Sequence, residues 1–329
     1  MPQSYISGLG HYVPQKCVTN KDLEKLMDTT DEWIIERTGI NTRHWVDIDK
    51  ESTAGMGTKA SQIAIENAGL SIADIDFIIF CTLSPDYFFP GCGVLVQEQL
   101  GASTIGALDI RNQCSGFVYG LSIADQFIKT GMYKNILVIG SEIQSTGMDI
   151  TTRGRNVSVI FGDGAGAAVV SATQKTGKGI LSTHLHSEGK YAEELMAKDR
   201  CCTTAKEKPF DVERFYPVMN GNNVFKHAVT RFPEVINEAL KQNGYTAADI
   251  NMLIPHQANL RISQFIQRSM KLSDKQVYNN IMNYGNTTAA SIPIALSEAC
   301  KKGIVNEGDL VCLAAFGSGF TWASALIKW

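Results

Sequence analysis

The 329-residue chain lacks several features that would assign a protein to a class at once. No apolar run approaches the roughly 20 residues that a transmembrane helix needs. The first residues show neither the charged region nor the apolar stretch of a signal peptide, and residues 4–9 are instead typical of a first strand. The net charge is only −3, so the composition gives no indication of a nucleic-acid partner. We therefore expect a cytoplasmic globular protein with no membrane segment.

The cysteines show neither a metal-binding nor a redox pattern. They form no C-x-x-C pair, and no histidine lies at metal-ligand spacing beside them. Several lie inside apolar runs, which is typical of a reducing compartment where most thiols act as small core residues. We therefore expect no metal site. The eight positions are Cys17, Cys81, Cys92, Cys114, Cys201, Cys202, Cys300 and Cys312.

An internal duplication indicates the fold class. Residues 67–82 have a counterpart at 242–257 with five of the sixteen positions identical, and residues 135–140 match 310–315 at the same offset of 175. Two matches at one offset favour a duplicated α/β unit. The length and the 44% apolar content allow one large core or two domains. We predict an α/β protein with an N-terminal half over 1–172 and a C-terminal half over 173–329. Each half should build a mixed sheet flanked by helices, with an active site between the halves.

Cys114 is the most informative residue. It lies where a predicted buried strand, 105–110, turns into a predicted helix. Helical spacing follows at four apolar positions, Phe117, Leu121, Ala124 and Ile128. Unpaired backbone N–H groups and the helix dipole favour a thiolate at such a place. A core cysteine is the structural alternative; the polar residues before Cys114, and Gly116 and Gly120 after it, argue against that alternative.

His256 and Asn286 are two further candidates. A strand predicted to end at Pro255 leaves His256 at its carboxyl end, where α/β proteins commonly place reactive groups. A structural histidine fits this position equally well. Asn286 lies in a predicted tight turn before a helix expected over 289–302. Asparagine is common in such turns as a cap or in a left-handed conformation, so this residue taken alone favours a structural role.

Two glycine-rich segments remain. Residues 161–166 lack the Lys-Ser/Thr of a phosphate-binding P-loop and do not match G-x-G-x-x-G with an acidic residue about twenty positions on. We predict a tight turn there, with close backbone packing. Residues 316–322 lie at the end of a predicted buried strand, where backbone N–H groups could bind an oxyanion.

Cys114, His256 and Asn286, in this order and in these contexts, resemble the catalytic set of the ketoacyl synthase III family. These are thiolase-like condensing enzymes, 3-oxoacyl-[acyl-carrier-protein] synthases III. The resemblance covers essentially the whole chain, including residues 30–39 and both glycine-rich segments. It implies a thiolase-like fold with duplicated α-β-α-β-α layers and mixed sheets. It also implies a homodimer that uses acyl-CoA and malonyl-acyl carrier protein to make 3-oxoacyl-carrier protein, CO2 and CoA.

The resemblance also assigns roles. Cys114 would be the nucleophile that acetyl-CoA or a short acyl-CoA acylates, since a thiolate suits thioester exchange. His256 and Asn286 would hold the malonyl thioester oxygen while decarboxylation turns it into an enolate, which attacks the acyl-cysteine. Backbone N–H groups of Cys114 and Ser318 would form the oxyanion hole. Many family members carry glycine at the position of Ser318, a difference that a backbone donor tolerates. No metal, redox nucleotide or prosthetic group is implied.

The remaining assignments concern binding. Phe89 would close the acyl pocket of the partner subunit. Trp33 and Arg37, one helical turn apart, would flank the adenine of CoA, with Arg155 nearby. Asn222 and Phe225 would line the channel that binds the pantetheine arm of CoA. Three cations predicted to share one helix face would meet the acidic carrier protein: Arg261, Arg268 and Lys271. An ordinary solvated helix face is the structural alternative for both sets.

Three other functions share part of this sequence pattern. Residues 187–218 are longer and more polar than expected for the compact initiating enzymes, and 111–120 and 153–162 also resemble a specialised branch. That branch condenses longer or aromatic primers, for example towards alkylquinolones or dialkylresorcinols, and is the alternative function. A degradative thiolase needs a second catalytic cysteine in the C-terminal loop, where this chain has Gly317-Ser-Gly319. A non-catalytic carrier-binding relative would lack one of the three catalytic polar residues, and all three are present.

Overall fold

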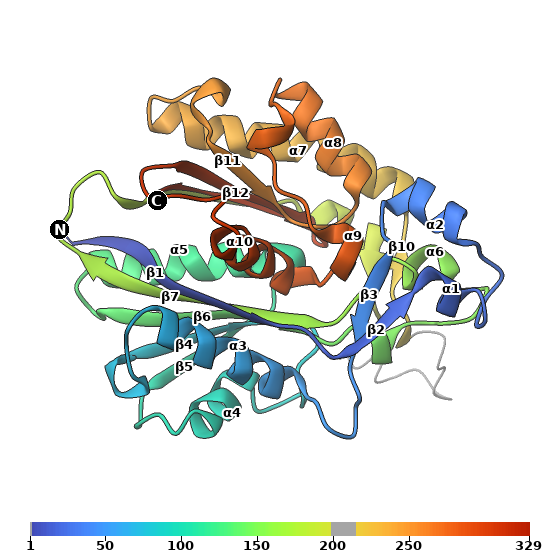
Figure 1. Ribbon diagram of the computed structural model, residues 1–329, viewed down its shortest axis with the longest axis horizontal. Helices are drawn as coiled ribbons and strands as arrows, with labels where there is room; N and C mark the ends of the chain where they lie inside the picture. Colours follow the sequence, from blue (N-terminus) through green and yellow to red (C-terminus); the bar gives the residue numbers. More distant parts are fainter. Residues whose placement is uncertain (1, 199–214) are drawn as a thin grey trace.

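The structure, a computed structural model, describes residues 2–198 and 215–329 of the chain. In this part of the chain two mixed β-sheets lie one above the other (Figure 1). The strands of the first sheet are, in order, β1 (Gln3–Tyr12), β7 (Gly164–Thr173), β6 (Asn135–Glu142), β4 (Phe77–Cys81) and β5 (Gly106–Ile110). Those of the second sheet are β11 (Met252–Pro255), β12 (Leu310–Gly317), β13 (Thr321–Lys328) and β8 (Gly179–Ser187).

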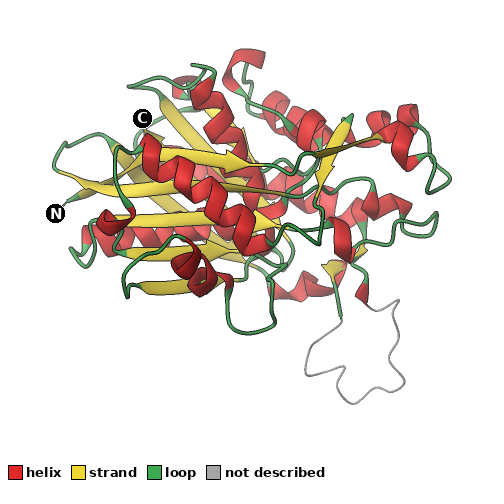
Figure 2. Cartoon of the chain, turned by 60° about the horizontal axis from the view of Figure 1, so that its bottom comes forward, coloured by secondary structure: helices red, strands yellow, loops and turns green. Residues whose placement is uncertain are grey.

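Helices form three layers around these sheets, as Figures 1 and 2 show. The two central helices share one apolar core with strands of both sheets, and two further apolar clusters lie under the outer helices. The α-β-α-β-α arrangement predicted from the sequence is therefore confirmed. The central helices are α5 (Gly116–Lys129) and α10 (Ser291–Lys301). The outer helices are α3 (Thr53–Asn67) and α4 (Cys92–Gln99) on the first sheet, and α7 (Gly221–Gln242) and α8 (Leu260–Ser269) on the second.

Smaller elements gather at one end of the molecule, on the right in Figure 1. They are β2 (Lys16–Thr19), α1 (Asn20–Leu23), α2 (Asp31–Thr38), β3 (Thr42–Trp45), α6 (Arg155–Ser158), β9 (Leu195–Met196), β10 (Val218–Met219) and α9 (Ile281–Tyr284). Short 3-10 turns connect the larger elements: η1 (Ile72–Asp74), η2 (Gln113–Ser115), η3 (Ser145–Gly147), η4 (Gly189–Glu194), η6 (Ala247–Asp249), η7 (Asp274–Gln276) and η8 (Thr288–Ala290).

The helix predicted after Cys114 forms as expected and explains the central layer. The side chains of Phe117, Leu121, Ala124 and Ile128 are all fully buried. They belong to the apolar core between the sheets, because spacings of three and four residues place them on one face of α5. The helix predicted over 289–302 differs in its beginning: η8 comes first, and the α-helix proper begins at Ser291.

The duplication is visible in backbone hydrogen bonds as well as in sequence. Asp76 N donates to Asn135 O in the first half, and the residues 175 positions later repeat this bond, from Asn251 N to Leu310 O. The side chains match too: Asp76 accepts from Asn135 N, and Asn251 accepts from Leu310 N. Parallel pairing of β4 with β6 and of β11 with β12 keeps the same register. Each sheet is thus built from one half of the chain, whereas the division at 172/173 stays a prediction.

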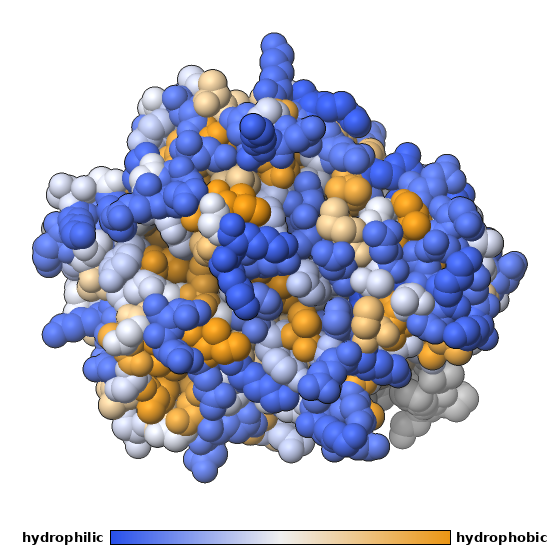
Figure 3. All heavy atoms as spheres, viewed as in Figure 1, coloured by the Kyte–Doolittle hydropathy of each residue, from blue (hydrophilic) through white to orange (hydrophobic). Residues whose placement is uncertain are grey.

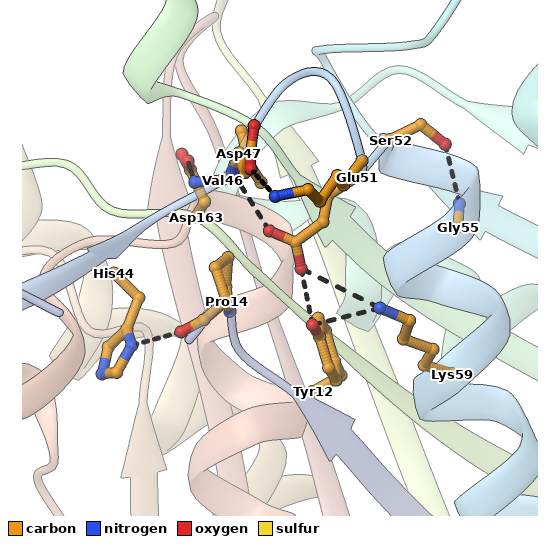
Figure 4. Close-up of polar contacts among 11 residues, drawn as sticks. Tyr12, Pro14, His44, Val46, Asp47, Glu51, Ser52, Gly55, Lys59 and Asp163 are labelled. Carbon is orange, nitrogen blue, oxygen red and sulfur yellow. Dashed lines mark hydrogen bonds and ion pairs between the residues drawn. The ribbon is translucent and has the colours of Figure 1, made fainter. Parts of the chain in front are cut away.

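A polar network fixes the connection between β3 and α3 beside the end of β1 (Figure 4). Tyr12 Oη donates to Glu51 Oε1 at 2.5 Å, and Lys59 Nζ donates to Tyr12 Oη at 3.1 Å. The backbone N–H of Val46, at the start of the same connection, donates to Asp163 Oδ2 at 2.9 Å. Asp163 belongs to the first glycine-rich segment, so the network fastens that segment to the first sheet.

In the described residues no helix is both long and apolar enough to cross a bilayer. Cys201, Cys202 and part of the polar segment at 187–218 lie outside the described residues.

We predict that Gly10→Ala destabilises the protein. A Cβ at this position would lie 2.2 Å from Ala60 O and 2.6 Å from Ala64 N, so β1 and α3 would have to separate. We expect a loss of at least about 2 kcal/mol in the free energy of unfolding, measured by urea denaturation. Gly147→Ala is the matched control, because its Cβ meets no atom within 4 Å. Equal stability of the two variants would contradict this account of the β1–α3 contact.

Candidate active site

A cavity of about 140 Å³ lies where the two halves of the chain meet. Cys114, His256 and Asn286, the three residues predicted to be catalytic, all line it among mostly apolar neighbours. The convergence follows from the topology. Parallel pairing brings the carboxyl ends of neighbouring strands to one edge of each sheet, and the connections that follow β5 and β11 carry Cys114 and His256. The structure thus brings together three residues that are 142 and 30 positions apart in the sequence.

Cys114 lies in η2, immediately before α5, and it touches the end of β12. A Cβ on Gly317 would lie 2.6 Å from Cys114 Cβ and 3.1 Å from its Sγ, so only glycine permits this approach. The backbone N–H groups of Cys114 and Ser318 both donate to the sulfur. These are the two donors predicted for an oxyanion hole, and they come from opposite halves of the chain.

The predicted preference for a thiolate at Cys114 is wrong for the unliganded protein. Burial raises the pKa of the Cys114 thiol to about 12, and the nearby Glu142 carboxylate raises it further. The two backbone N–H groups lower the pKa but do not outweigh burial. Removing water from around a thiolate destabilises it by more than the helix terminus and the two backbone N–H groups stabilise it. The thiol is therefore neutral at pH 7.

His256 is held as a neutral imidazole. Its backbone N–H donates to Ala314 O at 2.7 Å, which continues the pairing of β11 with β12. Burial lowers the pKa of His256 to about 3. Nδ1 lies 2.6 Å from Ser291 Oγ, and the same oxygen accepts from Gln257 N at 3.3 Å. The Ser291 hydroxyl hydrogen can then be donated to Nδ1, and in that tautomer the imidazole proton is on Nε2.

The Nε2 atom of His256 is buried and has no hydrogen-bond partner among the described residues. An unpaired buried polar group is costly, and in a cavity wall it is typical of a site that awaits a ligand.

Asn286 is fixed by backbone and side-chain hydrogen bonds, although it is itself neither left-handed nor the N-cap of η8. It follows Gly285, which has a left-handed φ of 66°, and its backbone bonds with Ile160 and Gly162. Its side-chain Oδ1 accepts from Thr288 N, two residues later, at 2.8 Å, which stabilises the turn before η8. With Oδ1 occupied in this way, the amide NH2 is the group left to donate into the cavity.

Gln257 holds the His256 and Asn286 segments together. Its side-chain NH2 donates to Pro255 O at 2.7 Å, while its Oε1 accepts from the backbone N–H groups of Asn280 and Ile281. These N–H groups begin α9, the short helix that leads to Asn286. The spacing between the two donors is therefore set by buried hydrogen bonds.

For residues 161–166 the predicted close backbone packing is confirmed, but the segment is not a tight turn, since Gly164 already begins β7. A Cβ on Gly162 would lie 2.3 Å from Tyr284 O, and one on Gly166 would lie 2.7 Å from Pro293 Cβ. The glycines allow backbones to pack closely beside the Asn286 turn.

The cavity continues between β9, β10 and the start of α7. Leu195 and Met219 are paired across the β9–β10 ribbon, and Phe225 lines the opposite wall. The Ser318 hydroxyl donates to Leu195 O, which fastens the ribbon to the oxyanion loop. Asn222 is exposed at the start of α7 and does not line the cavity.

Trp33, Arg37 and Arg155 come together as predicted. The Arg37 guanidinium lies 4.4 Å and that of Arg155 5.1 Å from the centre of the Trp33 ring. Asn259, which lines the cavity, donates to Arg37 O at 2.9 Å, so this cation–π group adjoins the cavity.

The other predicted residues lie away from the cavity. Phe89 is 81% exposed on the connection between β4 and α4. Arg261 and Arg268 are exposed on α8, and neither forms an ion pair with any described residue. Lys271 lies two positions beyond the end of α8, in a left-handed conformation with φ of 56°. Its predicted place on the helix face is therefore wrong, because the helix ends first.

Sequence reasoning missed four residues of this site. Ser291 lies only five positions after Asn286, but nothing in its context indicates a partner for His256. Leu195 and Met219 are ordinary apolar residues without a motif. Glu142 is buried at the end of β6, where a run of apolar residues predicts only a strand. No group of three His, Cys, Asp or Glu side chains in the described ranges is placed to hold a metal ion.

Comparison with known proteins agrees with this geometry. Residues 108–189 match the family model described as 3-oxoacyl-[acyl-carrier-protein (ACP)] synthase III, and residues 240–329 match its C-terminal model. A β-ketoacyl-[acyl-carrier-protein] synthase III from Caldanaerobacter subterraneus subsp. tengcongensis is 46% identical over 98% of this chain and 97% of its own length.

Solved structures give the same result. The crystal structure of 3-oxoacyl-[acyl-carrier-protein] synthase III from Aquifex aeolicus VF5 is 43% identical and superposes with a TM-score of 0.92, covering 99% of this chain and 100% of that one. The priming β-ketosynthase from the R1128 polyketide biosynthetic pathway is 32% identical with a TM-score of 0.91, covering 99% and 96%.

We predict that Cys114 alkylates slowly at neutral pH, because its thiol is buried and its pKa is raised. The rate with iodoacetamide should rise about tenfold per pH unit from pH 8 to pH 10 without a plateau, since the thiolate fraction rises in that proportion. The exposed Cys17 is the internal control, and mass spectrometry of the separate peptides measures both rates. A plateau for Cys114 below pH 8 would show that the thiol ionises far more readily than burial allows.

Proposed function

Because the chain belongs to the 3-oxoacyl-[acyl-carrier-protein] synthase III family, we propose that it starts fatty-acid synthesis. It condenses an acetyl or short acyl group from acyl-CoA with malonyl-acyl carrier protein and releases CO2 and CoA. One observation carries the assignment of the site: Cys114, His256 and Asn286 meet in one buried cavity with two backbone N–H groups directed at the sulfur. That set provides a nucleophile, an oxyanion hole and two further donors.

The first half-reaction uses Cys114. Its sulfur attacks the thioester carbonyl of acyl-CoA, and the backbone N–H groups of Cys114 and Ser318 stabilise the oxygen of the tetrahedral intermediate. The C–S bond to CoA breaks, and the departing CoA thiolate takes up the proton that the Cys114 thiol has lost. No net charge is created in the buried site, which matters because the thiol begins neutral.

The second half-reaction uses His256 and Asn286. The malonyl thioester loses CO2, and the developing enolate oxygen accepts from His256 Nε2–H and from the Asn286 amide. The enolate carbon then attacks the acyl carbonyl, and the bond to Cys114 breaks. The Cys114 thiolate takes up a proton from solvent, which replaces the one that left with CoA. A histidine with a pKa near 3 stays neutral throughout, so it supplies a hydrogen bond without a competing positive charge.

Acyl-CoA would enter through the channel that Phe225 lines. Trp33, Arg37 and Arg155 at its entrance offer an aromatic face and two guanidinium groups, which suit an adenine ring and phosphates. Asn222, exposed beside this entrance, is assigned to CoA by resemblance.

A second copy of the chain would complete the acyl pocket. β5 is the edge strand of the first sheet, and the adjoining loop exposes three aromatic residues in succession, Tyr87, Phe88 and Phe89. An open edge strand beside exposed aromatic rings is typical of a surface that pairs with another chain. In the homodimer, Phe89 would reach the pocket of its partner. The cytoplasmic location stays a prediction.

The alternative is a ketosynthase III of secondary metabolism that takes a longer or aromatic primer. The similarity to a priming β-ketosynthase of a polyketide pathway is consistent with this alternative function. The greater identity to β-ketoacyl-[acyl-carrier-protein] synthases III favours the fatty-acid function.

We predict that acetyl-CoA or another short acyl-CoA loads Cys114 selectively. Intact-mass analysis after incubation with acyl-CoAs from acetyl to octanoyl, and with anthraniloyl-CoA, measures the adducts. Cys114→Ala should lose the adduct completely, because no other described thiol lines the cavity. The buried Cys312→Ala is the control and should still be acylated. Selective loading of a long or aromatic group would favour the alternative function, and no adduct from any donor would contradict the mechanism.

We predict that Arg261→Glu weakens use of malonyl-acyl carrier protein. Arg261 lies in the first turn of α8, where the helix dipole disfavours a cation, and it has no carboxylate partner among the described residues. The KM for the carrier protein should rise at least about tenfold, and the effect should shrink at high salt. Lys301→Glu on α10 is the charge-matched control. Equal KM values for the two variants would remove α8 from the carrier-binding surface.

A further inference from the structure

A buried carboxyl group beneath the cavity has no part in the mechanism described above. Glu142 ends β6 and its side chain is fully buried. Its carboxylate accepts from Ser84 Oγ at 2.6 Å, from Thr82 Oγ1 at 3.1 Å, from Leu83 N at 3.2 Å and from Gln144 Nε2 at 3.3 Å. No cation forms an ion pair with Glu142 in the described part of the chain. Burial of a carboxylate without a cation lowers the stability of the fold, so we expect Glu142 to have a role in the site.

Two of the segments that Glu142 binds lead to predicted site residues. Thr82, Leu83 and Ser84 begin the connection that carries Phe89. On the other side, the backbone N–H of Ala289 also donates to the carboxylate, three residues after Asn286. Glu142 is therefore the common acceptor for the Phe89 connection and the Asn286 turn.

The third neighbour of Glu142 is the thiol itself. The charge of Glu142 is the largest influence on Cys114 after burial, and it opposes ionisation of the thiol. The other titratable groups that face Glu142 are Cys81 from β4 and Cys92 from α4. Asp109 acts on both cysteines, and Asp86 acts on Cys92. None of these neighbours is a cation, so nothing among them compensates the charge of an ionised Glu142.

We propose that Glu142 is a positioning residue for the condensation. Its carboxylate holds the Phe89 connection and the Asn286 turn in place beside Cys114. The inference rests on the proposed function for its catalytic meaning, since Cys114 matters as the nucleophile there.

The titration of Glu142 gives this proposal a pH signature. Burial raises the pKa of Glu142 to about 7, although its hydrogen-bond donors oppose the rise. Below pH 6 the carboxyl is therefore mostly protonated and leaves the thiol unaffected. Above pH 8 it is ionised and suppresses the thiolate, because a nearby like charge raises the pKa of the thiol.

The test is the alkylation rate of Cys114 by iodoacetamide in Glu142→Gln relative to the unchanged protein, followed at the Cys114 peptide from pH 6 to pH 9. We expect a ratio near one at pH 6 that rises to about tenfold or more above pH 8, equivalent to a thiol pKa lowered by about one unit or more. A purely structural effect would change the rate by the same factor at every pH. Asp163→Asn is the matched control: Asp163 is also fully buried with several donors, and its ratio should stay flat.

A second variant covers the case in which Glu142→Gln does not fold. Ser84→Ala removes the shortest hydrogen bond to the carboxylate, which raises the pKa of Glu142 and lowers its charge at pH 7.5. Alkylation of Cys114 should then be faster than in the unchanged protein at that pH, with no difference at pH 6. Flat ratios in the folded variants would overturn the proposal. Acyl loading of the unchanged protein tests the proposed function separately, so failure of one does not imply failure of the other.

Discussion

The contact between Gly317 and Cys114 is the constraint on which the rest of the site depends. It joins the end of β12, from the second half of the chain, to the turn after β5, from the first half. The absence of a Cβ at Gly317 lets the following N–H, that of Ser318, reach the sulfur beside the N–H of Cys114. An oxyanion hole built from one backbone group of each half requires that the halves pack at one fixed distance. The apolar core shared by α5, α10 and both sheets provides that packing.

Burial of the site also determines its electrostatics. The Cys114 thiol and the His256 imidazole both become neutral because water is excluded from them, and Glu142 titrates near neutral pH for the same reason. The site therefore works with dipoles, namely backbone N–H groups, an amide and a neutral imidazole, rather than with fixed charges. Dipoles already oriented by the fold can stabilise an oxyanion without a large rearrangement when charge appears. In the proposed mechanism, the cost is a Cys114 thiol that must lose its proton during the reaction.

Much of this could be predicted from the sequence, since it depends on local pattern. The offset of 175 residues implied two similar sheets, and helical spacing after Cys114 implied a central helix; the structure has both. The features that could not be predicted depend on how segments far apart in the sequence pack and on where each helix ends. The prediction of a thiolate at Cys114 was wrong. The sequence indicates the helix N-terminus, which favours a thiolate, but it does not indicate how deeply the thiol is buried, and burial is the larger effect. Lys271 was misplaced because the spacing predicts a helix face but not the residue at which the helix ends.

The residues that contact the candidate catalytic residues could not be predicted from the sequence either. Ser291 directs the proton of His256 across 35 positions, and Glu142 contacts the Asn286 turn through the N–H of Ala289. Neither has a motif, because a hydroxyl or carboxyl that orients another group needs only the right distance. Ser318 adds a hydroxyl at a position where a glycine would supply the same backbone donor, and that hydroxyl bonds Leu195 O in the channel wall. The wall and the oxyanion donor are thus fastened to one residue. Movement of the β9–β10 ribbon would shift the Ser318 N–H, so in the proposed mechanism the shape of the channel and the geometry of the oxyanion hole are mechanically coupled.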